Sequence, residues 1–168
     1  MKRLTALMAV AALVVGSAMV FAQAKPNFAG KWTLDPAVAP AAGNGAPGGG
    51  RGGRGGGLGQ ELTITQDATT LTLEYVGGGR NPGPMKLAYR LDGSESKNPG
   101  MGGQEQVSKA AWQGDHLVVT TQLNFGGNSV EQKRTFSLEG GNLVIESVNP
   151  GREGGAGTPM KMTYKKAS

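Results

Sequence analysis

The sequence contains no cysteine and a single histidine, His116. Without cysteine, disulfide bonds, thiolate metal ligands and a cysteine nucleophile are excluded. With one histidine, multi-histidine metal sites and most acid–base relays are excluded as well. The acidic residues are scattered and show no spacing that is typical of paired catalytic carboxylates. We therefore expect no catalytic residue, no metal and no cofactor, with an enzyme of unrecognised site as a remaining alternative.

Helical periodicity and aromatic residues are also scarce, the latter making up 5% of the 168 residues. Short runs instead alternate apolar and polar residues between glycine, proline, asparagine and aspartate, which is typical of half-buried strands. The pattern predicts an all-β protein. Its nine predicted strands are 28–34, 61–66, 70–76, 85–91, 105–112, 116–125, 129–138, 142–148 and 160–165.

The connections between these runs are mostly short enough for hairpins, at 67–69, 114–115, 126–128 and 140–142. Asn-Pro-Gly at 81–83, 98–100 and 149–151 predicts three further turns. An antiparallel up-and-down meander of eight or nine strands hides its edges by closing into a β-barrel, or alternatively by forming a β-sandwich. Nine strands predict that connections 35–60, 77–84, 113–115 and 139–141 share one end. An antiparallel barrel needs an even number, so one strand is left unexplained.

The N-terminus carries the pattern of a signal peptide: Lys2 and Arg3, an apolar run, and Ala22-Gln23-Ala24. We predict cleavage after Ala24, export to the periplasm or the exterior, and a single domain over 25–168; an uncleaved membrane anchor is the alternative. Export would leave 15 basic and 12 acidic side chains, a net charge of +3. Because the basic residues are dispersed, we expect no nucleic-acid binding, and after cleavage no stable membrane insertion.

Glycine dominates residues 43–59, where it fills 11 of 17 positions. Such a segment can bury little, so we predict a flexible loop. Arg51 and Arg54 follow an Arg-Gly-Gly pattern that also occurs in RNA-binding segments. With two such units and no aromatic residue in the tract, a surface loop is the better interpretation.

Alternation assigns residues to one face of each strand, and we expect these faces to line the interior. The predicted interior residues are Leu62, Ile64, Gln66, Leu71, Leu73, Tyr75, Leu87, Tyr89, Leu91, Val130, Gln132, Arg134, Phe136, Leu138, Met160, Met162 and Tyr164. Arg134 is the exception on an apolar face, because a buried guanidinium needs a carboxylate, carbonyls or an anionic ligand. Alternatively, Arg134 covers Trp32 as a cation–π partner, or a bulge turns it outward. The candidate ligand-binding residues are Tyr75, Tyr89, Trp112, Gln132, Arg134 and Phe136.

Residues 27–32, Asn-Phe-Ala-Gly-Lys-Trp, resemble the opening strand of the calycin superfamily, which comprises lipocalins, fatty-acid-binding proteins and avidins. The chain is also similar to small secreted bacterial lipocalin-like proteins of unassigned function. The resemblance implies a barrel whose floor is plugged by Phe28, Gly30 and Trp32.

The resemblance further implies a non-catalytic cup for a small apolar or anionic amphiphilic molecule, since fatty-acid binders use interior arginine and tyrosine. The alternative is a barrel filled by its own side chains that acts as a structural or protein-interaction module through its loops or an edge strand.

Overall fold

The computed structural model describes residues 25–37, 58–77, 83–100, 103–125, 128–148 and 159–167. Within these residues the chain forms ten strands and no α-helix. The strands are β1 (Gly30–Leu34), β2 (Glu61–Gln66), β3 (Thr70–Gly77), β4 (Gly83–Arg90), β5 (Glu95–Pro99), β6 (Glu105–Gln113), β7 (His116–Phe125), β8 (Asn128–Glu139), β9 (Asn142–Val148) and β10 (Pro159–Lys166).

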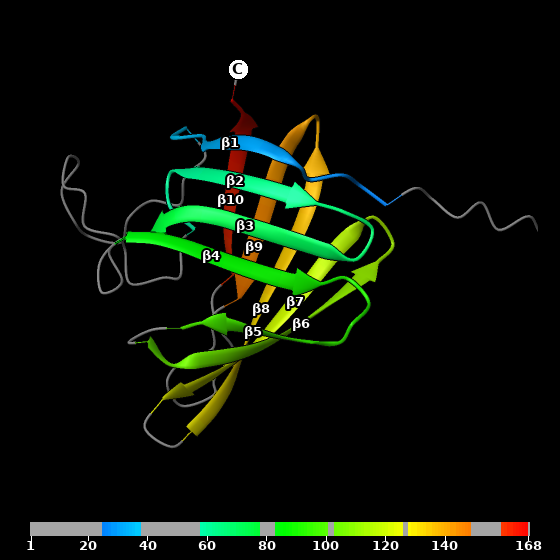
Figure 1. Cartoon of the computed structure of the whole chain (residues 1–168). Helices are drawn as coiled ribbons and strands as arrows, with labels where there is room; N and C mark the ends of the chain where they lie inside the picture. The colour runs from blue at the N-terminus through cyan, green and yellow to red at the C-terminus, as the bar shows by residue number, and fades with distance from the viewer. Residues whose placement is uncertain are drawn as a thin grey trace, which may run out of the picture.

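The strands form one sheet in the order β4-β3-β2-β1-β10-β9-β8-β7-β6-β5, and every paired neighbour is antiparallel. Figure 1 shows β1 to β4 crossing in front of β7 to β10 at a steep angle, so that the sheet curls on itself. The first strand pairs with the last, with Leu34 opposite Tyr164. The result is the predicted up-and-down barrel, nearly closed, with β4 and β5 as its two edges.

Side chains bridge the seam between these two edges. The amide of Ala88 donates to Oδ1 of Asn98 at 2.7 Å, and Nδ2 of Asn98 donates back to the Ala88 carbonyl at 3.0 Å. The amide of Arg90 donates to Oγ of Ser96 at 2.8 Å. These bonds satisfy backbone groups that a neighbouring strand would otherwise pair.

The strand β5 corrects the prediction of a turn at 98–100, because Asn98 and Pro99 lie in the strand. Asn98 is 5% exposed and its amide is held by the seam. Pro99 lacks an N–H, which an edge strand tolerates. With this extra reversal the strand number is even. The same reversal moves connections 113–115 and 139–141 to the end opposite 35–60 and 77–84, so that part of the prediction was wrong.

The two ends of the barrel therefore differ. At the mouth end, the strand ends flank connections 35–60, 78–82, 100–104, 126–127 and 149–158. At the floor end, the turns are short: Gly140 and Gly141, with φ of +57° and +83°, join β8 to β9 as glycine permits. There too, Asp67 Oδ1 accepts hydrogen bonds from the amides of Thr69 and Thr70 at 2.7 and 2.8 Å.

Aromatic side chains fill the floor end. Phe28 is fully buried just before β1, and Trp32 is 3% exposed. Gly30, with φ of +143°, bends the chain between them, so that Nε1 of Trp32 donates to the Phe28 carbonyl at 2.9 Å. The Phe28 ring stacks on Trp112 at 5.8 Å and lies 6.2 Å from Phe136. The hydrophobic core is thus densest where the turns are shortest.

The predicted signal peptide, 1–24, lies outside the described residues, as does most of the glycine-rich segment. Its last two residues are described, and they are packed rather than loose. Leu58 is fully buried in the core, and the Gly59 carbonyl accepts a hydrogen bond from the Tyr164 hydroxyl at 3.1 Å. A Cβ on Gly59 would lie 2.9 Å from the Val76 carbonyl oxygen, so this close approach requires glycine.

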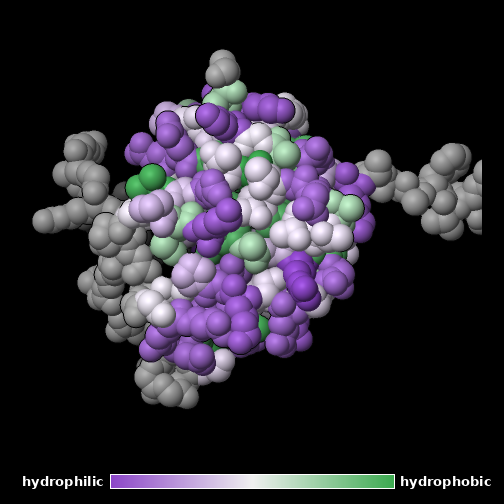
Figure 2. Space-filling model, in the orientation of Figure 1, coloured by the Kyte–Doolittle hydropathy of each residue, from purple (hydrophilic) through white to green (hydrophobic). Residues whose placement is uncertain are grey.

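Polar residues dominate the outer surface on the face that Figure 2 shows, where hydrophobic residues form small separate spots. In the described part of the chain, no helix has the length and apolar character needed to cross a bilayer.

Candidate functional site

The interior of the barrel has an apolar wall and a polar wall. The apolar wall comes from β2 to β4 and β10, whose inward residues pack into one core cluster. These are Leu62, Ile64, Leu71, Leu73, Leu87 and Met162, each at most 6% exposed. Alternation placed all of them in the interior, and the structure confirms that placement. The predicted interior residue Leu138 is an exception: it lies at the floor end of β8 and is 38% exposed.

The polar wall comes from β5 to β9. One row of directly paired residues crosses four strands: Ser96, Ser108, Thr121 and Gln132. All four are at most 8% exposed. The next row toward the floor contains Arg134 on β8 and its partner Ser147 on β9. Buried polar groups in such number are costly unless they are hydrogen-bonded.

Arg134 is half-buried and lies near three phenols: Tyr75 and Tyr89 come from β3 and β4 across the barrel, and Tyr164 comes from β10, two strands from β8. It forms a hydrogen bond with Tyr89, and its charge acts on Tyr75 and Tyr164. Burial raises the pKa of all three tyrosines, that of Tyr164 to about 12, and the guanidinium partly opposes this shift. The phenols therefore stay neutral. The Tyr164 hydroxyl donates its proton to the Gly59 carbonyl, which leaves the hydroxyls of Tyr75 and Tyr89 to donate beside a fixed positive charge.

Acidic side chains are placed on the outside. Every described Asp and Glu is exposed except Asp35. Asp35 pairs with Lys165 at 2.9 Å, and this hydrogen bond lowers the pKa of its carboxyl group. The described part of the interior therefore presents a cation and hydrogen-bond donors without an acidic side chain. Such a site favours an anion.

Some inward-facing residues near the mouth end are partly exposed, whereas a group near the floor is fully buried. Near the floor, Phe28, Leu71, Leu117, Phe136 and Leu143 are fully buried. Near the mouth, Tyr75, Met85, Leu123 and Met160 are half-buried. Arg134 lies between these half-buried residues and the fully buried ones near the floor.

The predicted ligand-binding residues fall into two groups. Tyr75, Tyr89 and Arg134 come together, and Gln132 lies one row closer to the mouth on β8. Trp112 and Phe136 instead pack around Phe28 at the floor. One structural alternative placed Arg134 over the Trp32 ring. The cation that lies over this ring is Lys166, with Nζ 5.8 Å from the ring centroid. No bulge turns Arg134 outward, because it stays in register between Val119 and Ser147.

Two residues of the interior were missed as candidates. Alternation placed Tyr164 on an inward face, but it does not give the register that brings Tyr164, two strands away, near Arg134. Ser147 follows Leu143 and Ile145 at a spacing of two, which marks it as inward-facing. Its hydroxyl is buried and has no hydrogen-bond partner among the described residues.

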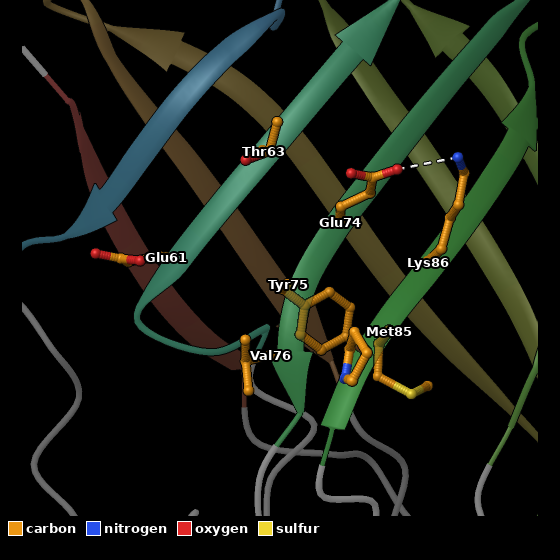
Figure 3. Close-up of a pocket in the computed structure, with 8 residues that line it drawn as sticks. Glu61, Thr63, Glu74, Tyr75, Val76, Met85 and Lys86 are labelled. Carbon is orange, nitrogen blue, oxygen red and sulfur yellow. Dashed lines mark ion pairs between the residues drawn. The ribbon is translucent and has the colours of Figure 1, made fainter.

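A groove of about 470 Å³ lies along β2 to β4 and shares inward-facing Tyr75 and Met85 with the interior. It is lined by Glu61, Thr63, Glu74, Tyr75, Val76, Pro84, Met85 and Lys86. Figure 3 shows Glu74 and Lys86 side by side across β3 and β4, where they form an exposed ion pair at 2.9 Å. Exposed, self-paired charges of this kind contribute little to binding. Among the described residues, no cluster of His, Asp and Glu could hold a metal ion.

No protein-family model and no curated protein matches the chain. Solved structures do match. Zebrafish ileal bile acid-binding protein in complex with cholic acid superposes with a TM-score of 0.54 at 19% identity, over 83% of this chain and 98% of that one. The wild-type fluorescent protein UnaG gives 0.54 at 16% identity, over 83% and 97%. The REP1-NXSQ fatty acid transporter gives 0.52 at 13% identity, over 83% and 96%.

At these identities the likeness shows the fold alone, which is a nearly closed antiparallel barrel of the calycin-like class. The narrower resemblance to small secreted bacterial lipocalin-like proteins stays a prediction.

Proposed function

We propose that this protein is a non-catalytic carrier that binds a small anionic amphiphile inside the barrel. The single observation that carries the proposal is the position of Arg134, which faces the phenols of Tyr75, Tyr89 and Tyr164 in an interior whose described acidic side chains all point elsewhere. A carboxylate, sulfate or phosphate head would bind the guanidinium and accept hydrogen bonds from the phenols of Tyr75 and Tyr89.

The apolar wall supports the rest of the proposal. A hydrocarbon chain that extends from Arg134 toward the mouth would contact half-buried Met85 and Met160, whose flexible side chains adapt to irregular apolar shapes. Two of the superposed structures are named for the fatty acid or bile acid that they carry. That likeness in fold is consistent with the same ligand class in this barrel.

The experiment compares oleate with oleyl alcohol, which has the same chain and no charge, by isothermal titration calorimetry. We expect Arg134→Gln to weaken oleate binding roughly 10- to 100-fold, the value of one charge-assisted hydrogen bond, and to leave the alcohol unchanged. Lys133→Gln is the matched control, because it removes the same charge from the exposed face of the same strand. Equal binding of oleate by wild type and Arg134→Gln would refute the proposed role, and no binding of either probe would refute the function.

We also propose that the chain is exported and cleaved after Ala24. The basic start, the apolar run and Ala22-Gln23-Ala24 support this proposal. N-terminal sequencing of the protein purified from its source should read Lys25 first. An intact N-terminus on membrane-bound protein would contradict it.

A further inference from the structure

The polar wall holds more hydrogen-bonding side chains than an anionic head group alone needs. Arg134 and the phenols account for the head, yet Ser108, Thr121 and Ser147 are buried on the same wall at 2%, 6% and 1% exposure. Oγ of Ser108 and Oγ1 of Thr121 lie 2.9 Å apart and share one hydrogen bond. Since each hydroxyl carries one proton, this pair uses one and leaves the other to donate elsewhere.

Ser147 adds a second donor to the same region. Its hydroxyl is buried without a hydrogen-bond partner among the described residues, and its strand neighbours are Arg134 and Met160. A buried hydroxyl with no partner costs stability, so such groups are retained in native proteins mainly where a ligand or an ordered water satisfies them. The two donors lie in adjacent rows, about 7 Å apart along the strand direction and on either side of β8, so they form two separate donor positions.

We propose that these side chains form a second subsite with two donor positions, the Ser108–Thr121 pair and Ser147, either of which binds an oxygen on the body of the ligand. This inference rests on the proposed function and narrows its ligand class. The preferred ligand is an anionic amphiphile that carries a hydroxyl or keto group on one side of its apolar body. Its oxygen faces either the Ser108–Thr121 pair or Ser147, while its bare side faces the leucines of the apolar wall.

The test uses octadecanoate and a mid-chain hydroxyoctadecanoate, which differ in one oxygen. Wild-type protein should bind the hydroxylated probe about fivefold more tightly for each hydrogen bond it gains, as measured by calorimetry. Ser147→Ala or Thr121→Val, whichever removes the donor that the hydroxyl reaches, should reduce that preference toward one. Binding of plain octadecanoate should change little in either variant.

The matched controls are Ser137→Ala and Thr120→Val. Ser137 is 7% exposed and Thr120 is half-buried, but both lie on the outward face of their strands. Both controls should keep the full preference. Ser147→Ala should also keep or raise the urea midpoint, because it removes a buried hydroxyl whose hydrogen bonding is incomplete.

The outcomes separate the two proposals. Equal affinity of wild type for both probes would overturn the second subsite, and would leave the carrier function standing if Arg134→Gln still weakens octadecanoate. A preference that survives in both Ser147→Ala and Thr121→Val would also overturn the subsite, since the selectivity would then lie elsewhere. If wild type binds neither probe, the subsite and the carrier function both fail.

Discussion

The floor of the barrel makes a quantitative prediction about its two tryptophans. Trp32 is 3% exposed in the core, and its indole N–H is donated to the Phe28 carbonyl at 2.9 Å. Truncation of a buried tryptophan to alanine typically costs 3 to 5 kcal/mol, and the orphaned carbonyl adds about 1 kcal/mol. We therefore expect Trp32→Ala to lower the free energy of unfolding by roughly 5 kcal/mol, a large share of the 5 to 15 kcal/mol typical of a domain.

Truncation of Trp112 should lower the free energy of unfolding by less than truncation of Trp32. Trp112 is half-buried, it stacks on Phe28 at 5.8 Å, and its Nε1 has no hydrogen-bond partner among the described residues. Its removal therefore orphans no other group, and we expect Trp112→Ala to cost about 2 kcal/mol through lost contact area. Trp32→Phe should fall between the two, because it keeps most of the apolar volume and deletes the N–H.

Urea denaturation, monitored by circular dichroism, measures the order of stability of these three variants. For an m-value of about 2 kcal/mol/M, the two alanine variants should differ by more than 1 M in midpoint. Because Trp32→Ala could unfold the chain outright, Trp32→Phe keeps the comparison measurable. Equal midpoint shifts for Trp32→Ala and Trp112→Ala, or no shift for Trp32→Phe, would refute the interpretation of Trp32 as a hydrogen-bonded plug.

Three further predictions concern the seam, the glycine-rich segment and the buried phenol. Asn98→Ala should lower the free energy of unfolding by about 2 to 3 kcal/mol in urea, because it removes both hydrogen bonds to the backbone of Ala88. Replacement of 43–57 by a short linker should change the same quantity by about 1 kcal/mol or less, whereas Leu58→Ala should cost about 2 to 5 kcal/mol because Leu58 is fully buried. The pKa of Tyr164 is raised to about 12 in the folded protein against 10.0 for the free phenol. The neutral phenol therefore contributes its full stabilisation of the fold below pH 10, and this stabilisation is lost as the pH rises toward 12. Urea midpoints should fall between pH 10 and pH 12, and they should fall less steeply in Tyr164→Phe.

Alternation in the sequence predicted every strand whose inward positions are apolar, because apolar residues at every second position mark a strand with one buried face. The strand β5 escaped for the same reason. Its sequence, Glu-Ser-Lys-Asn-Pro, offers Ser96 and Asn98 as inward residues, and these bond across the seam instead of entering the apolar cluster. No apolar period marks such a strand, and Asn-Pro-Gly at its end is typical of a turn.

The candidate site was predictable in its residue types and only partly in its membership. An arginine on an apolar face indicated a site for an anion, and the alternation of residues placed Tyr75 and Tyr89 on inward faces. Tyr164 and Ser147 depend on the register of the strands that follow β8. The predicted hairpin at 140–142 sets β9 next to β8, but alternation does not show that Ser147 pairs with Arg134 or that Tyr164 comes near it.

The missed strand also determines at which end of the barrel each later connection lies. In an up-and-down barrel each strand reverses direction, so one uncounted strand moves every later connection to the opposite end. With β5 included, the turn after Trp112 lies at the floor, where Trp112 packs on Phe28 rather than at the mouth. Substitution of Trp112 therefore tests stability, whereas Arg134, between the sealed floor and the half-buried residues of the mouth, is the position at which a change in ligand affinity is informative.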